Sequence, residues 1–316
     1  MKKRRSWGAL LLSFGGLGIG LLVLSTLIDV RAAMISLAQA DLRWVAVAVV
    51  LALNASVIVG GKLWAVVRIV DEPRTYREAW SAVMAGVTLN AVIPGRGGDL
   101  IRAVFLAKEP GSLPVLLGAV VVERLGDLFA LGLLVLVIAP RADLITLSAV
   151  ATILIAVGGT AALAWLGPNM PVKPELGERV ARTAGRVLQR PKYAIMALSL
   201  SFLAWVNNAA MLVVTLRAVG VTAPFIETYR AAAVGILAGI VPVSVSGIGT
   251  RDTVLVLTLE PYGQGASVAA GSLLFTILMY WFLALVGSLS LGRETLAAVK
   301  RASSRRDASA EEIDSR

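Results

Sequence analysis

Six apolar runs, each long enough to cross a lipid bilayer, constrain this chain more than any other feature. They occupy residues 7–28, 44–67, 113–139, 144–166, 193–216 and 266–291. A helix needs about 20 apolar residues to cross a hydrocarbon core of ~30 Å. The runs are continuous rather than alternating, and in lipid a chain satisfies its backbone only as helices or closed barrels. The sequence therefore predicts an all-α integral membrane protein with about six transmembrane helices.

The amino-acid composition excludes several classes of catalytic and metal-binding site. Of the 316 residues, 57% are hydrophobic and 16% are charged, whereas a soluble domain has roughly 25% charged residues. The chain has no cysteine and no histidine, which excludes disulfides, thiolate or imidazole metal sites, and Ser-His or Cys-His catalysis. It also has no nucleotide-binding motif. We expect no catalytic residue, no metal and no cofactor.

The net charge of +10 suggests a nucleic-acid partner, but the positions of the Lys and Arg residues along the chain give another explanation. With the N-terminus in the cytoplasm, most Lys and Arg residues fall on the inner side, as the positive-inside rule requires. We therefore expect no nucleic-acid partner, and a cell-membrane protein with both termini cytoplasmic. Residues 174–192 form a basic amphipathic segment that would bind anionic inner-leaflet lipids. Residues 293–316 are predicted to be a disordered cytoplasmic tail.

Two shorter apolar stretches are interrupted by turn-forming residues. Residues 79–94 and 99–107 flank a Pro-Gly-Arg-Gly-Gly turn, and residues 229–259 contain a similar Gly-rich bend. The break residues are Asn90, Pro94, Gly95, Gly97 and Gly98 in the first stretch, and Pro242, Gly247 and Gly249 in the second. Such backbone is tolerated in a membrane only inside protein or around a watery cavity. Each stretch is predicted to be a re-entrant hairpin.

The two hairpins belong to an internal repeat. Trp44 pairs with Tyr193 and Arg68 with Arg217, in both cases at a spacing of 149 residues. The repeat units are 44–139 and 193–291, with 7–28 and 144–166 as additional helices in one membrane domain, 1–292. If the hairpins do not cross the membrane, the two units have opposite orientations. Inverted repeats with broken helices are the construction of many secondary transporters.

Ionisable residues gather at the hairpin breaks and in the run 113–139. The predicted substrate-binding residues are Arg96, Asp99, Arg102, Glu123, Arg124, Asp127, Arg251 and Asp252. Intramembrane charges cost several kcal/mol each unless they pair or line a cavity, so they indicate a functional path. The four arginines balance the four acids. The simpler interpretation is that these ion pairs only hold the hairpins to the core.

Three segments together resemble a known family. The segments "LNAVIPGRGGDLIRAVFL", "VVERLGDL" and "IVPVSVSGIGTRD" are similar to the flippase-like family defined by the membrane region of lysylphosphatidylglycerol synthase, over residues 7 to 292. The resemblance implies a domain that moves a lipid with a modified head group between leaflets. The aminoacyl-transferase domain of the synthases is missing, so we expect a stand-alone member without lysyl transfer.

The sequence thus predicts a transporter for a phosphate-bearing modified lipid, either a phospholipid or a polyprenyl-linked lipid. One alternative is a membrane lipid-diphosphate phosphatase, for which Ser244, Ser246 and Thr250 at the second break offer hydroxyl nucleophiles. Another alternative is a non-catalytic membrane assembly subunit. The sequence is also compatible with a homodimer.

Overall fold

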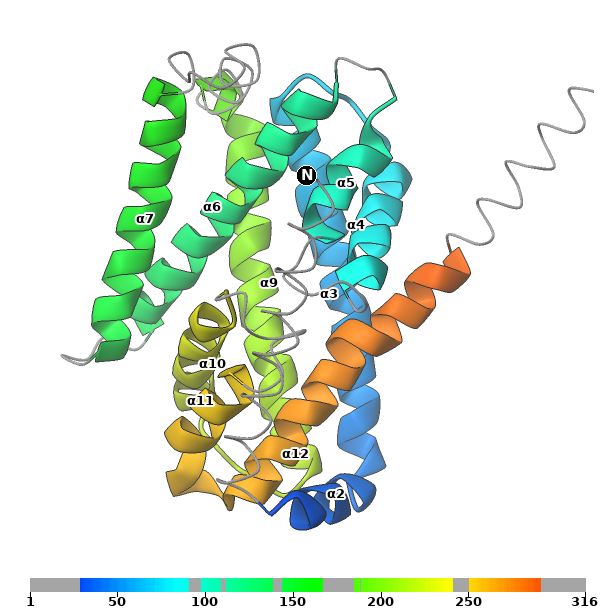
Figure 1. The fold of residues 1–316 in the computed structure, drawn as a ribbon, viewed down its shortest axis with the longest axis vertical. Helices are drawn as coiled ribbons and strands as arrows, with labels where there is room; N and C mark the ends of the chain where they lie inside the picture. The colour runs from blue at the N-terminus through cyan, green and yellow to red at the C-terminus, as the bar shows by residue number, and fades with distance from the viewer. Residues whose placement is uncertain are drawn as a thin grey trace, which may run out of the picture.

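The computed structural model describes residues 29–90, 98–108, 112–138, 144–166, 185–187, 189–240 and 250–290. Over these residues every regular element is a helix (Figure 1). The elements are α2 (Val30–Ala38), α3 (Leu42–Ile69), α4 (Tyr76–Asn90), α5 (Gly98–Leu106), α6 (Leu113–Ile138), α7 (Leu144–Leu166), α9 (Pro191–Ala218), α10 (Phe225–Ile240), α11 (Thr250–Leu259), η3 (Glu260–Tyr262), α12 (Gly265–Thr276) and η4 (Ile277–Phe282).

Long helices coincide with five of the six predicted apolar runs. Three helices of the described chain are long and apolar enough to span a membrane, namely Leu42–Ile69, Pro191–Ala218 and Gly265–Ser290. The helices α6 and α7 match the predicted runs 113–139 and 144–166. The run 7–28, the tail 293–316 and most of the segment 174–192 lie outside the described residues. The all-helical class is confirmed, and the count of six spans stays a prediction.

The internal repeat is visible in the helix boundaries. The helices α3 and α9 each have 28 residues, and both their starts and their ends are 149 residues apart. Both helices end in the same cap, with a left-handed residue at corresponding positions, Asp71 (φ 59°) and Gly220 (φ 82°). In each case the next N–H donates back to a carbonyl five residues earlier, at 3.0 Å in α3 and 2.9 Å in α9. The two units therefore share local geometry as well as residue spacing.

The helices α3 and α9 pack against each other in opposite directions (Figure 1). At one end the Asp41 N–H, at the start of α3, donates to the Ala218 carbonyl, at the end of α9, at 2.8 Å. In the middle Asn54 Nδ2 donates to Asn207 Oδ1 at 2.8 Å. At the other end Arg190 pairs with Asp71 at 2.5 Å. Polar contacts at three levels fix the register of this central pair.

Each predicted hairpin consists of two short helices that pack on each other. The pairs are α4 with α5, and α10 with α11, and in Figure 1 they lie toward opposite ends of the molecule. Asn90 ends α4, and its Oδ1 accepts the first N–H of α5, that of Gly98, at 2.8 Å. A Cβ on Gly98 would lie 2.3 Å from the Gly86 carbonyl oxygen, so only glycine permits this approach. The other predicted break residues, within 91–97 and 241–249, lie outside the described residues.

Candidate functional site

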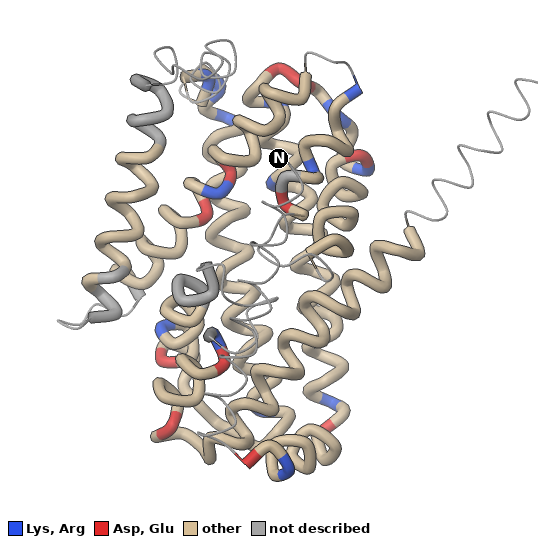
Figure 2. Tube along the Cα trace, in the orientation of Figure 1, with Lys and Arg blue, Asp and Glu red and all other residues tan. Residues whose placement is uncertain are grey.

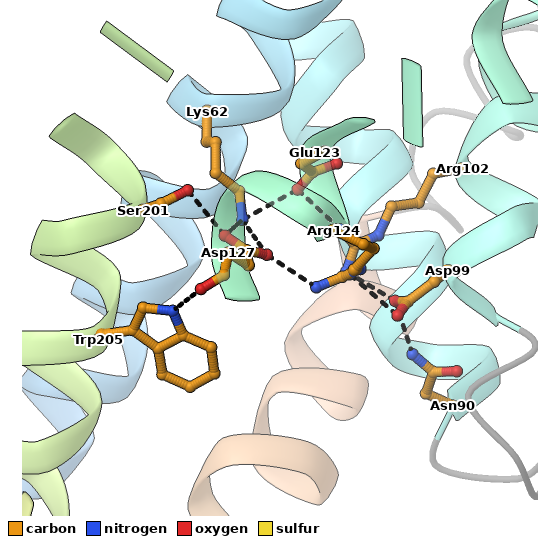
Figure 3. Close-up of polar contacts among 9 residues, drawn as sticks. All are labelled: Lys62, Asn90, Asp99, Arg102, Glu123, Arg124, Asp127, Ser201 and Trp205. Atoms are coloured by element: carbon orange, nitrogen blue, oxygen red, sulfur yellow. Dashed lines mark hydrogen bonds and ion pairs between the residues drawn. The ribbon is translucent and has the colours of Figure 1, made fainter. Parts of the chain in front are cut away.

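A network of six ionisable residues, four of them buried and two partly exposed, connects the first hairpin to α3 and α6 (Figure 3). Its members are Lys62 of α3, Asp99 and Arg102 of α5, and Glu123, Arg124 and Asp127 of α6. Figure 2 shows that the α6 charges lie part-way along the helix, away from both ends. Three positive and three negative side chains make this first cluster neutral.

The helical spacing of α6 places its two acids on one face. Glu123 and Asp127 are four residues apart, and Lys62 Nζ lies between them, 3.0 Å from Glu123 Oε1 and 2.7 Å from Asp127 Oδ1. The opposite side of Asp127 meets α9, where Ser201 Oγ donates to Oδ1 at 2.7 Å and Trp205 Nε1 donates to the backbone carbonyl at 2.9 Å. Contacts from α3 and α9 thus fix the position of the Asp127 carboxylate.

The arginines of the first cluster share the Asp99 carboxylate. Arg102 Nη2 lies 3.0 Å from Asp99 Oδ1, and Arg124 Nη2 lies 2.9 Å from Asp99 Oδ2. Arg102 Nη1 is 3.6 Å from Glu123 Oε1, and Arg124 Nη1 is 3.1 Å from Asp127 Oδ2. Asn90 Nδ2 donates to Asp99 Oδ1 at 3.1 Å. Each arginine therefore bridges the hairpin and α6.

Sequence reasoning missed Lys62. Its side chain is only 3% exposed, and it is the central cation of the α6 acids. The signal was present, because a lysine within an apolar run needs either a path to water or a buried partner. The predicted balance of four arginines and four acids therefore omitted a cation that the structure places in the network.

The second hairpin carries a smaller polar group built around Arg251 of α11. Arg251 Nη2 lies 2.9 Å from Asp252 Oδ1 and 3.4 Å from Ser272 Oγ of α12, and it also donates to Thr276 Oγ1. Ser272 Oγ donates to Asp252 Oδ1 at 2.5 Å. The π-helical segment η4 begins directly after Thr276, and such segments are frequent at functional sites.

The two polar groups occupy corresponding places in the repeat. The Arg102 Cγ lies 2.9 Å from the position of a Cβ on Gly86, and the Arg251 Cγ lies 2.9 Å from that of a Cβ on Gly235. Both the glycines and the arginines are 149 residues apart. At the same spacing Glu123 corresponds to Ser272, Asp127 to Thr276 and Lys62 to Met211. The second copy therefore keeps the arginine, has two hydroxyls and a thioether at these three positions, and pairs the arginine with Asp252.

One cavity of about 160 Å³ joins the two groups. The ionisable residues that line it are Lys62, Asp99, Arg102, Arg124 and Asp127 of the first cluster, together with Arg251 and Tyr280. Apolar side chains such as Leu212, Leu255 and Phe275 form much of the remaining wall. Glu123, Asp252, Ser272 and Thr276 are not among the lining residues and contact the arginines from behind.

Buried polar atoms without a hydrogen-bond partner among the described residues concentrate around this cavity. They are Arg102 Nε and Nη1, Arg124 Nε, Arg251 Nε, Asn208 Oδ1 and both carboxylate oxygens of Glu123, with Thr228 Oγ1 elsewhere. Buried polar groups in native proteins are nearly always hydrogen-bonded, so these atoms have hydrogen-bonding capacity to offer a ligand or water in the cavity. Most of these atoms are donors, which suits an anionic ligand.

The predicted site residues thus fall into two groups around one space. The structure brings Asp99, Arg102, Glu123, Arg124 and Asp127 together and places Arg251 across the cavity with Asp252 behind it. Arg96 lies outside the described residues.

Comparison with known proteins identifies a family. A family model described as the lysylphosphatidylglycerol synthase TM region matches residues 7–287. No curated protein matches the chain. The family model covers both copies of the repeat, supports a membrane location and points to a function related to membrane lipids. The chain belongs to the family of the lysylphosphatidylglycerol synthase transmembrane region.

Proposed function

We propose that the protein is a transporter that moves a phosphate-bearing lipid, a phospholipid or a polyprenyl-linked lipid, between the leaflets of the cell membrane. The observation that carries this proposal is the set of unbonded donors of Arg102, Arg124 and Arg251 around one cavity. Arginine presents a planar fork that matches two phosphate oxygens, and such charge-assisted hydrogen bonds are about twice as strong as neutral ones.

The arrangement of the repeat supports alternating access to this cavity. The antiparallel pair of α3 and α9 and the opposite placement of the two hairpins are the geometry expected of inverted, re-entrant units. Basic residues cluster at the base of the first hairpin, with Arg74, Arg77 and Lys108 around a second pocket. By the positive-inside rule this end is cytoplasmic, and the base of the second hairpin faces outside.

In this proposal the phosphate exchanges partners with carboxylates. Arg102 and Arg124 are both held by Asp99, and Arg251 is held by Asp252. An arriving phosphate competes with these carboxylates, first at one copy and then at the other, while the lipid chain stays in the membrane. The balance of cations and carboxylates stabilises the site without a bound lipid, because unpaired buried charges are strongly unfavourable.

Leaflet exchange in proteoliposomes tests the proposal. Labelled phosphatidylglycerol should cross with the wild-type protein, and Arg251→Ala should reduce the exchange rate at least tenfold. Arg43→Ala is the matched control, because the Arg43 side chain is 93% exposed at the start of α3. Equal rates for the wild type and Arg251→Ala would remove the cavity from the transport path.

One observation favours a lipid-diphosphate phosphatase as the second candidate. The Ser272 hydroxyl donates to Asp252 beside Arg251, which resembles a nucleophile, a base and a phosphate-binding group. This candidate ranks second because Ser272 is fully buried behind Arg251 and does not line the cavity. Release of inorganic phosphate from a polyprenyl diphosphate, lost in Ser272→Ala, would favour the phosphatase.

A further inference from the structure

We propose that the protein takes up one proton with each anionic lipid head group that it binds, and that Glu123 is the residue that carries the proton. This inference rests on the proposed function, because it begins with a phosphate that enters the cavity. The protein would then transport two species, the lipid and a proton.

The described ionisable residues around the cavity have no net charge before an anionic head group binds. The first cluster holds three cations and three carboxylates, and the Arg251–Asp252 pair adds no net charge. A phosphodiester brings one negative charge into this space. An uncompensated charge is far more costly in a buried, water-poor site than in water. One proton per lipid restores neutrality.

Three carboxylates could accept that proton, and their contacts differ. Asp127 accepts hydrogen bonds from Lys62 and Ser201, and it also pairs with Arg124. Asp99 pairs with both arginines and accepts a hydrogen bond from Asn90. Each aspartate therefore has a hydrogen-bond donor as well as cationic partners.

Glu123 depends on two cations alone. Its side chain is 0% exposed, and neither carboxylate oxygen accepts a hydrogen bond from the described residues. Its partners are Lys62 at 3.0 Å and Arg102 at 3.6 Å, and both of these line the cavity whereas Glu123 does not. A phosphate in the cavity therefore attracts both partners of Glu123 and leaves that carboxylate with the least compensation.

The step involves no change in the lipid. The proton comes from the buffered bulk solvent, converts the Glu123 carboxylate into a carboxylic acid, and returns to the solvent when the lipid leaves. The titratable and charged groups around Glu123 are Lys62 on α3, Asp99 and Arg102 on α5, Arg124 and Asp127 on α6, Arg251 on α11 and Tyr280 on η4.

The second copy lacks the equivalent pair. Ser272 and Met211 occupy the places of Glu123 and Lys62, so Arg251 has no flanking glutamate and lysine of this kind. Proton binding by Glu123 is therefore a property of the first copy. A head group that moves to Arg251 leaves Glu123 free to recover its partners and release its proton.

Calorimetric titration of the purified protein with dihexanoyl phosphatidylglycerol tests the inference. Titration in two buffers of different ionisation enthalpy, at the same pH, gives the number of protons taken up per lipid. We expect about one for the wild type, with an affinity that falls by up to about tenfold per pH unit as pH rises. The lipid phosphodiester does not titrate near neutral pH, so the proton must bind to the protein.

Three variants assign the proton. Glu123→Gln should take up close to none and bind with no loss of affinity, because the cluster then carries a net positive charge. Glu123→Asp keeps a carboxyl group and should still take up about one proton. Glu260→Gln makes the same substitution at an exposed position and should match the wild type.

The outcomes separate the two proposals. Lipid binding by the wild type without proton uptake overturns this inference and leaves the proposed function standing. Failure of the wild type to bind the lipid overturns both. Proton uptake that persists in Glu123→Gln overturns the assignment to Glu123. The pH dependence of the wild type decides whether a proton is taken up even if a variant does not fold.

Discussion

Arg102 is the residue whose contacts reach furthest through the first cluster. It is buried, pairs with Asp99 on its own helix and lies within ion-pair distance of Glu123 on α6. Its side chain also passes directly over Gly86 of α4. The side chain of one arginine thus contacts three helices. Its removal should lower both the stability of the protein and the rate of lipid exchange.

Replacement of Arg102 alone should destabilise the protein. In Arg102→Gln, Glu123 keeps only Lys62 as a cation, and breaking a buried pair costs about 3 kcal/mol. For a chain of this size we expect the thermal midpoint in detergent to fall by roughly 5–10 °C.

The double variant Arg102→Gln with Glu123→Gln removes both charges and should recover most of that loss without recovering lipid exchange. Exposed Arg43→Gln is the matched control and should not shift the midpoint. A single variant as stable as the wild type would contradict the paired-charge description.

Residues of the site were largely predictable because charges within apolar runs are conspicuous. Glu123, Arg124 and Asp127 interrupt a run of aliphatic residues, and Arg251 follows a Gly-rich bend. Lys62 was missed because one lysine leaves the run 44–67 apolar enough to be predicted as a span. The contacts of Ser272 and Ser201 could not be predicted, because isolated hydroxyls are common in membrane helices and only tertiary packing selects those that meet a charge.

Within the helices, the close packing of each hairpin depends on glycine. A Cβ at position 235 would meet the Arg251 Cγ at 2.9 Å, and one at position 86 would meet the Arg102 side chain and the Gly98 carbonyl oxygen at the same distance. The arginine stems therefore lie where a side chain would otherwise stand. The first hairpin has less freedom to adjust because one of the obstructing atoms belongs to the backbone.

Gly235→Ala should displace Arg251 without unfolding α10. Alanine favours helix over glycine, but the added Cβ meets the Arg251 Cγ, near the stem of a buried and paired side chain, so the thermal midpoint should fall while α10 stays helical. Exchange of labelled phosphatidylglycerol should fall at least fivefold because the guanidinium is moved from the cavity wall.

Gly158→Ala on α7 is the control, since a Cβ there meets nothing within 4 Å. An exchange rate equal to that of the wild type in Gly235→Ala would show that the position of Arg251 is not critical.

Helix positions were predictable to within a few residues, but the crossings between them were not. The apolar runs 44–67 and 193–216 became α3 and α9 with only short extensions at each end, because burial in lipid sets the length of a span. The glycine–arginine contacts depend on how α4 crosses α5 and how α10 crosses α11. Sequence periodicity carries no information about that geometry.

At the scale of the whole molecule, the repeat predicts opposite sidedness for the bases of the two hairpins. Lys108 and Glu260 are exposed and follow the second helix of each hairpin. Single cysteines at these positions are unique labels, because the chain has no cysteine of its own. The exposed Lys108–Glu78 pair contributes little, so its loss should not disturb the fold.

Lys108→Cys should react with a membrane-impermeant maleimide only from the cytoplasmic side, and Glu260→Cys only from outside. Inverted and right-side-out vesicles provide the two orientations, and the cysteine-free wild type gives the background. Reaction of both cysteines from the same side would refute the inverted arrangement.

The three-level contact between α3 and α9 has a mechanical consequence. If two crossed rods turn about a fixed middle, the displacement grows with distance from that point and is smallest at the centre. The Asn54–Asn207 hydrogen bond lies near that centre and can persist, acting as an axle. The Arg190–Asp71 pair and the Asp41–Ala218 bond lie at the far ends of the lever and must yield first. The Arg190–Asp71 pair joins two exposed residues that water can solvate when they part, whereas Ala218 is buried, so separation at the Arg190–Asp71 end is the easier of the two.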